Sequence, residues 1–103
     1  MDKRQASRPI ARLYCSDFTI KEITPANGIC FTLAELQGYV GGLIEILPLE
    51  EDELEDRLLV VHEEGKLLSL PYNIPATLIW IMYYGDTDYV SGNAVICHPS
   101  FIR

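Results

Sequence analysis

Apolar and polar positions repeat with different periods along the chain, and these periods predict short strands and two helices. Residues 18–23 alternate with a period near two, and residues 29–31 are apolar. Between them lies Pro25-Ala26-Asn27-Gly28, in which Asn27 and Gly28 tolerate the positive φ angles of a tight turn. The pattern therefore predicts a hairpin of residues 18–23 and 29–31.

The next segment carries the signals of a short helix. Thr32 and Glu35 have the spacing of a capping box, in which each residue satisfies a backbone N–H near the other. Gly41 and Gly42 follow the apolar positions, and glycine readily takes the left-handed conformation that ends a helix. We expect a helix over residues 33–40.

The middle of the chain predicts strands separated by a very acidic run. Residues 43–47 are apolar and branched, and we expect them to form the central strand. Residues 50–56 hold six acids, whose repulsion favours an exposed loop or frayed turn. Residues 58–62 and 67–70 then predict a second hairpin around the turn at residues 63–66.

The last third is harder to assign. Residues 76–84 are apolar on all sides and rich in strand-favouring types, so helix and strand both stay open. We expect a helix because Asn73 can cap it and Pro75 fits its first turn. Residues 90–97 predict a last, interrupted strand, and the tail from residue 98 is expected to be loose.

This order of elements predicts an α+β fold, a small mostly antiparallel sheet of about five strands with two short helices. At 103 residues the chain has the usual size of one domain. Residues 1–13 carry four basic residues against one acidic residue, and the remainder carries four against fourteen. We therefore expect a flexible basic leader over 1–13 and a single domain over 14–103.

The charge distribution bears on partners and location. The formal net charge is −7, and an acidic body repels phosphate, so we expect no direct nucleic-acid binding. No apolar run reaches the roughly 18 residues that span a bilayer, and the first residues lack the apolar centre of a secretion signal. We expect a cytoplasmic protein with free thiols at its three widely spaced cysteines.

Candidate chemistry is sparse. His62 and His98 are the only histidines, and neither lies in a recognisable catalytic setting. The acidic run lacks the alternating pattern of a calcium loop, and adjacent Cys97 and His98 point to opposite faces of a strand. No glycine-rich phosphate-binding motif is present. The sequence predicts no enzyme, no metal site and no cofactor.

Several short motifs follow one another in a fixed order along the chain. They read FTLAELQ, VGGLIE, EEGK, LPYN, AT and GNAV at residues 31–37, 40–45, 63–66, 70–73, 76–77 and 92–95. Together they resemble an uncharacterised family of small domains encoded by bacteria, phages, plasmids and conjugative elements. The resemblance covers roughly residues 16–97 and implies an accessory protein of a mobile genetic element, without implying a reaction or catalytic residues. The acidic run at 50–56 and the basic leader depart from the family pattern.

Two functions agree with these features. The first is a non-enzymatic interaction protein that binds a protein partner, such as a host protein, through its acidic surface. The alternative is a small-ligand-binding or sequestering protein with a pocket between the second helix and the sheet, which the sequence places at Tyr72, Asn73, Trp80 and Tyr83. An exposed strand edge or aromatic patch would also be compatible with a homodimer. The candidate binding residues are Glu45, Glu64, Tyr72, Asn73, Trp80 and Asn93.

Overall fold

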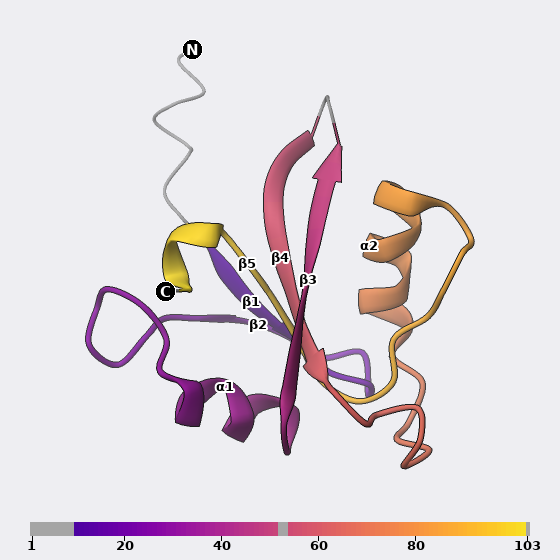
Figure 1. Cartoon of the computed structure of the whole chain (residues 1–103), viewed down its shortest axis with the longest axis horizontal. Coiled ribbons are helices and arrows are strands. Elements are labelled where there is room, and N and C mark those ends of the chain that lie inside the picture. Colours follow the sequence, from indigo (N-terminus) through magenta and orange to yellow (C-terminus); the bar gives the residue numbers. More distant parts are fainter. Residues whose placement is uncertain (1–9, 52–53, 103) are drawn as a thin grey trace.

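The structure, a computed structural model, describes residues 10–51 and 54–102 and contains a five-stranded antiparallel sheet with two α-helices (Figure 1). The strand order across the sheet is β2-β1-β5-β4-β3. The predicted α+β class is confirmed. The elements are β1 (Ala11–Tyr14), β2 (Ile20–Ile23), α1 (Leu33–Val40), β3 (Ile44–Glu51), β4 (Leu54–His62), α2 (Ile74–Tyr84), β5 (Ala94–Cys97) and the 3-10 helix η2 (Pro99–Phe101).

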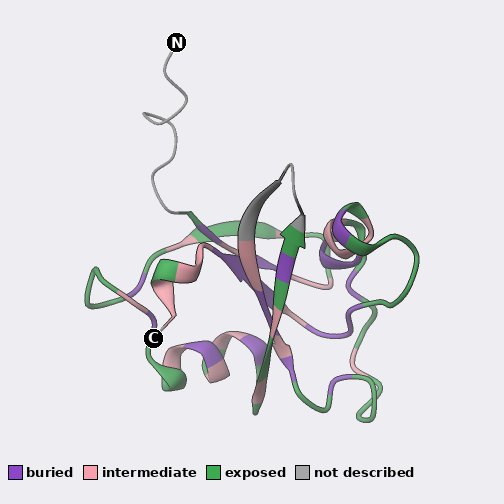
Figure 2. Ribbon diagram, turned by 45° about the horizontal axis from the view of Figure 1, so that its top comes forward, coloured by how far each residue is buried: buried purple, intermediate pink, exposed green. Residues whose placement is uncertain are grey.

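The two helices cover opposite faces of the sheet, so the domain has two small apolar cores (Figure 1). Successive side chains of a strand point to opposite faces, and β5 therefore contributes to both cores. Val95 and Cys97 pack with Leu36 and Val40 of α1. The α2 core contains Tyr14, Leu49, Leu59, Ala76, Tyr83, Val90, Ala94 and Ile96. Figure 2 shows buried residues concentrated in the middle of the sheet.

Helix α1 confirms the capping-box prediction. Thr32 Oγ1 accepts a hydrogen bond from the Glu35 N–H, and Glu35 Oε1 accepts one from the Thr32 N–H at 2.8 Å. The helix ends at Gly41, whose φ of 89° is the left-handed conformation that glycine adopts without strain. Gly42 is needed for another reason, because a Cβ at this position would collide with Nε2 of His62.

Residues 74–84 form a helix, which settles the choice between helix and strand. Asn73 is the N-cap, and its Oδ1 accepts a hydrogen bond from the Ala76 N–H at 3.0 Å. Pro75 occupies the first turn, where its missing N–H would have no partner within the helix. Capping therefore outweighed the strand propensity of the segment.

The predicted first hairpin is wrong in its pairing. β2 pairs with β1, not with residues 29–31, so residues 11–13 belong to the sheet and not to a leader. The turn between β1 and β2 is closed by the Cys15 N–H donating to the carbonyl of Thr19, and Phe18 takes a positive φ of 74°. Residues 1–9 of the predicted leader lie outside the described residues.

The predicted second hairpin is also wrong. β4 pairs with β3 on one side and with β5 on the other, while residues 63–69 form consecutive turns where the returning strand was expected. β3 runs beyond residue 47 to Glu51 and lies at the sheet edge, not at its centre. Much of the acidic run therefore belongs to β3 and β4, and residues 52–53 lie outside the described part of the chain.

The C-terminal segment is more ordered than predicted. The last strand begins at Ala94 rather than at residue 90, and its four residues are all buried. The tail forms η2, in which the Phe101 carbonyl accepts a hydrogen bond from the Phe31 N–H at 2.9 Å. The rings of Phe31 and Phe101 pack with their centroids 5.5 Å apart. These contacts attach the tail to the start of α1.

Candidate functional site

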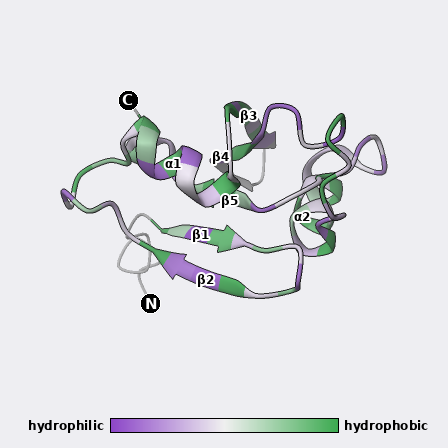
Figure 3. Cartoon of the chain, turned by 90° about the horizontal axis from the view of Figure 1, so that it is seen from below, coloured by the Kyte–Doolittle hydropathy of each residue, from purple (hydrophilic) through white to green (hydrophobic). Residues whose placement is uncertain are grey.

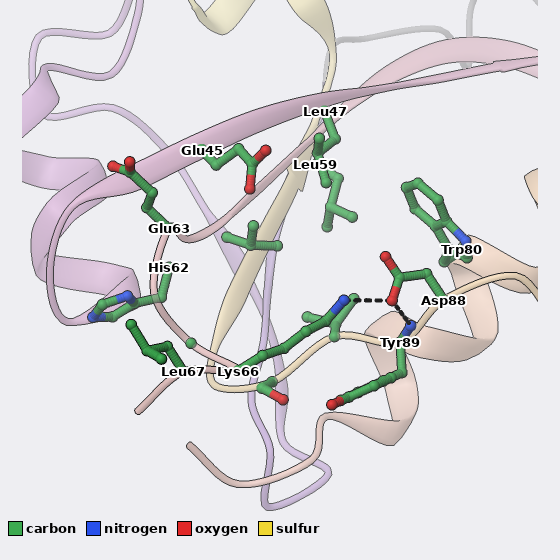
Figure 4. A pocket seen from close by; sticks show the side chains of 14 residues that line it. Glu45, Leu47, Leu59, His62, Glu63, Lys66, Leu67, Trp80, Asp88 and Tyr89 are labelled. Carbon is green, nitrogen blue, oxygen red and sulfur yellow. Dashed lines mark hydrogen bonds and ion pairs between the residues drawn. The ribbon is translucent and has the colours of Figure 1, made fainter. Parts of the chain in front are cut away.

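A pocket of about 410 Å³ lies between α2 and the β3–β4 hairpin (Figure 4). Its floor is part of the sheet face that α2 covers. Glu45 pairs with Val61, and Leu47 with Leu59, in the antiparallel register. Directly paired residues share one face of a sheet, so these four side chains lie together.

Two loops close the pocket and are held against each other. One is the run of turns after β4, where Gly65 lies so close to the next loop that a Cβ would approach the Ser91 carbonyl to 2.8 Å. The other leads to β5, and the Val90 N–H donates to Oγ1 of buried Thr77 in α2 at 2.9 Å. The Asn73 N–H in turn donates to the Val90 carbonyl at 2.8 Å.

An ion pair joins these loops at the pocket rim. Lys66 Nζ binds Oδ1 of Asp88 and lies 4.7 Å from the ring centroid of Tyr89 (Figure 4). The hydrogen bond from Lys66, with a second from the Tyr89 N–H, lowers the pKa of Asp88 from its ordinary value of 3.8. Asp88 is therefore ionised at neutral pH and neutralises the ammonium of Lys66.

Glu45 and Trp80 are the two predicted binding residues that line this pocket. Glu45 extends from β3 over the apolar floor, and Trp80 forms the wall on the α2 side (Figure 4). The Trp80 indole N–H donates to Oγ1 of Thr87 at 2.9 Å, and its ring packs against Tyr84 with 4.6 Å between centroids. These contacts hold the indole in place as a rigid wall.

The other predicted binding residues lie elsewhere. Glu64 is exposed in the turn after β4, where its N–H donates to Nδ1 of His62 at 3.0 Å. Tyr72 packs against the ring of Tyr89 outside the pocket lining. Asn93 accepts a hydrogen bond from the Ser16 N–H and lines a second hollow of about 330 Å³ beside the end of α1.

Asn73 and Tyr83, the remaining residues of the pocket expected from the sequence, are both buried. Tyr83 belongs to the α2 core. Asn73 is fully enclosed, and its amide Nδ2 donates to the carbonyls of Tyr14 and Gly92 at 2.8 and 2.7 Å. Asn73 thus ties α2 to β1 and to the loop before β5, and its position explains it as a structural residue.

The reactive side chains do not converge. The His62 ring points away from the pocket in Figure 4, although the residue borders it. The three cysteines are free thiols, and burial of Cys97 raises the pKa of its thiol to about 11. Within residues 10–51 and 54–102, no three His, Cys, Asp or Glu side chains lie close enough to hold a metal ion.

Lys66 and Asp88 complete the site, and neither was selected from the sequence as a binding residue. They are 22 residues apart in the chain, and only the packing of two loops brings them together. The one signal in the sequence was the opposite charge of these two residues. Opposite charges in turns are too common to indicate a contact.

These features define a small antiparallel α+β domain with one helix on each sheet face and a pocket beside the second helix. A family model described as a domain of unknown function (DUF3846) matches residues 15–100, and the chain belongs to this family. No curated protein and no solved structure matches the chain. Among the described helices, none has the length and apolar character needed to cross a membrane.

Proposed function

We propose that the protein is a non-enzymatic interaction protein that binds a protein partner through the outer face of α2. Ile74, Leu78 and Met82 occur at every fourth position of this helix, with 37%, 56% and 62% of their surfaces exposed. Residues four apart share one helix face. These three residues, here called the outer stripe, form a continuous apolar surface.

The outer stripe is the observation that carries the proposal. A surface helix usually presents charged side chains to water, whereas α2 has none along its 11 residues. Figure 3 shows the helix in green and pale colours, in agreement with this composition. Its inner residues, such as Ala76 and Tyr83, already pack on the sheet. Covering the outer stripe would remove apolar surface from water, which is the main favourable term in association.

The charges beside α2 indicate what the partner surface carries. Glu50 and Asp86 are both exposed, and both lie near the C-terminal end of the helix. The Glu50 N–H contacts the hydroxyl of Tyr84 at 3.4 Å, and Asp86 follows Gly85, the helix C-cap. Because the chain has a net charge of −7 and exposes the outer stripe, we expect a partner with an apolar groove and a basic rim.

The sequence resemblance described above supports an accessory role in a mobile genetic element. We therefore expect the neighbouring genes to encode recombination, transfer or phage functions. Sequencing the flanking regions tests this part of the proposal separately from partner binding. Neighbours drawn only from housekeeping operons would argue against it.

Site-specific photo-crosslinking in the native host tests the interaction. A photoreactive amino acid at position 78 should crosslink to one distinct protein, because Leu78 is central to the outer stripe. The same amino acid at exposed Ala34 on α1 is the matched control and should not. Adding Met82→Glu should abolish the crosslink at position 78.

The purified partner should then bind less tightly as salt rises, because screening weakens attraction between the acidic body and a basic rim. Two results would overturn the proposal. Equal crosslinking at positions 34 and 78 would show that the outer stripe is not selective. Crosslinks to a second copy of the chain alone would identify the stripe as a homodimer contact.

A further inference from the structure

The pocket between α2 and the β3–β4 hairpin has the dimensions and lining of a small-molecule site. Its volume of about 410 Å³ lies within the range of about 300–1,000 Å³ for such sites. Leu47, Leu59 and Val61 supply an apolar floor, and Trp80 supplies an aromatic wall. A ligand that fills this space must therefore present an apolar body.

The charged side chains that reach the pocket do not balance. Lys66 and Asp88 form an ion pair with each other, and Lys66 also lies over the ring of Tyr89. Glu45 remains, and its carboxylate has no hydrogen bond or ion pair to another residue within the described ranges. Glu63 also borders the pocket, but its carboxylate points away in Figure 4. The pocket thus has one uncompensated negative charge beside apolar walls.

We propose that this pocket binds a small organic cation, in which an ammonium or guanidinium group is joined to an apolar body. The cationic group would meet the Glu45 carboxylate, and the apolar body would lie over Val61 toward Trp80. Glu45 is exposed, so attraction between the opposite charges adds to the burial of the apolar body against the floor and Trp80 and selects a cation over an anion. An anion would find the ammonium of Lys66 already bound to Asp88.

This inference goes beyond the proposed protein interaction and is independent of it. Trp80 lies on the pocket side of α2, whereas the outer stripe lies on the side away from the sheet. Loss of one activity therefore leaves the other testable. A variant of the outer stripe serves as a control for ligand binding, and a variant of Glu45 serves as a control for partner binding.

Trp80 is the only tryptophan in the chain, so its fluorescence reports directly on the pocket. We would titrate the full chain with three probes of matched size: 2-phenylethylamine as the cation, 2-phenylethanol as the neutral form and 3-phenylpropionate as the anion. The proposal predicts saturable binding of the amine at least about tenfold tighter than that of the alcohol. The anion should bind most weakly.

Two isosteric variants then locate the charge that the amine contacts. Glu45→Gln should weaken amine binding by at least about tenfold and leave binding of the alcohol unchanged, since a charged hydrogen bond is lost. Glu63→Gln makes the same change in net charge beside the pocket, but its carboxylate points away. It should change amine affinity by less than about twofold, which excludes a general charge effect.

Several outcomes would overturn the inference. Equal affinity for the amine and the alcohol would refute charge recognition, as would an unchanged amine affinity in Glu45→Gln. A Trp80 signal that does not saturate with any of the three probes would refute the site itself.

A capped lysine peptide identifies the source of the cation. Tighter binding of the peptide than of 2-phenylethylamine would indicate an ammonium on a protein side chain, and tighter binding of 2-phenylethylamine would indicate a free amine.

Discussion

Replacement of Asn73 by alanine tests whether one buried amide holds α2 to the rest of the sheet. The side chain is fully buried and makes three hydrogen bonds: it caps α2 through Oδ1 and donates twice through Nδ2. Alanine removes all three bonds and leaves the carbonyls of Tyr14 and Gly92 facing an apolar side chain.

The expected loss follows from these contacts. Loss of the helix cap costs about 1 kcal/mol. Each buried carbonyl that loses its donor costs about 1–3 kcal/mol, and we take the lower end because a carbonyl can keep a second partner. The free energy of unfolding should therefore fall by about 3 kcal/mol, a large part of the 5–15 kcal/mol typical of a domain.

Equilibrium urea unfolding, followed by Trp80 fluorescence and circular dichroism, measures this change. With a slope of about 2 kcal/mol per molar, the midpoint should move down by about 1.5 M. Asn27→Ala is the matched control, because Asn27 also accepts two backbone hydrogen bonds but is exposed. Water can replace those bonds, so the loss there should stay below about 1 kcal/mol.

A second variant separates the two roles of Asn73. Asn73→Asp keeps the oxygen that caps α2 but replaces both amide donors by an acceptor that faces two carbonyl oxygens. It should be at least as unstable as the alanine variant at neutral pH. If the aspartate variant were as stable as the native protein, or if alanine cost less than the Asn27 control, the bridging role of the amide would be refuted.

Three further predictions concern glycine packing, a carboxyl pKa and a buried thiol. Gly42→Ala places a Cβ against the ring of His62 and should lower the free energy of unfolding by about 1–3 kcal/mol. Gly38→Ala is the control, because a Cβ there would meet nothing within 4 Å, and it should stabilise α1 by about 1 kcal/mol. Thermal melts that shift in the opposite directions would contradict this packing. Hydrogen bonds from the backbone N–H groups of the α1 N-cap and of the preceding loop lower the pKa of the Glu35 carboxyl in the folded protein. Glu35 therefore stabilises the fold at pH values above its unfolded pKa near 4.5, and this stabilisation is lost as the pH falls through the lower folded pKa. The urea midpoints of the native protein and of Glu35→Gln should therefore converge in acid. A difference between the two midpoints that stays constant from pH 6 to pH 3 would count against the hydrogen bonds to the Glu35 carboxylate. Burial raises the pKa of the Cys97 thiol to about 11, so little reactive thiolate forms at pH 8. Ellman's reagent at this pH should label the partly exposed Cys15 and Cys30 quickly and Cys97 only in urea. Fast reaction of all three thiols would contradict the burial of Cys97.

The features of the fold that could be predicted are those controlled by neighbours in sequence. The α1 boundaries follow from Thr32 and Glu35 at one end and Gly41 at the other, all within ten residues. The α2 start follows in the same way from Asn73 and Pro75. Each of these signals satisfies backbone groups locally, so no knowledge of the rest of the chain was required.

Strand pairing could not be predicted to the same extent, because it depends on residues far apart. The turn between β1 and β2 contains Phe18 at positive φ instead of the glycine or asparagine that marks such turns. The Asn27-Gly28 signal is real, but its turn leads into α1 rather than into a strand. Basic residues before β1 also gave residues 11–13 the composition of a loose terminus.

The candidate site was predicted only in part for the same reason. Glu45 and Trp80, two residues named from the sequence, line a pocket beside the second helix, whereas Tyr72, Asn73 and Tyr83 do not line it. Tyr72 and Asn73 lie close to Trp80 in sequence, but a helix cap and an exposed aromatic stack account for them. Lys66 and Asp88 needed the three-dimensional arrangement.

The central position of β5 has a consequence for how the protein can form during synthesis. β5 lies between β1 and β4, and its pairing joins residue 11 to residue 97. The sheet cannot close around its middle until β5, which follows the other four strands in the chain, has left the ribosome. Such distant pairing raises contact order and slows folding. A nascent chain that ends before β5 would leave the edges of β1 and β4 that pair with β5 without a partner strand, and unpaired edges are open to incorrect strand addition.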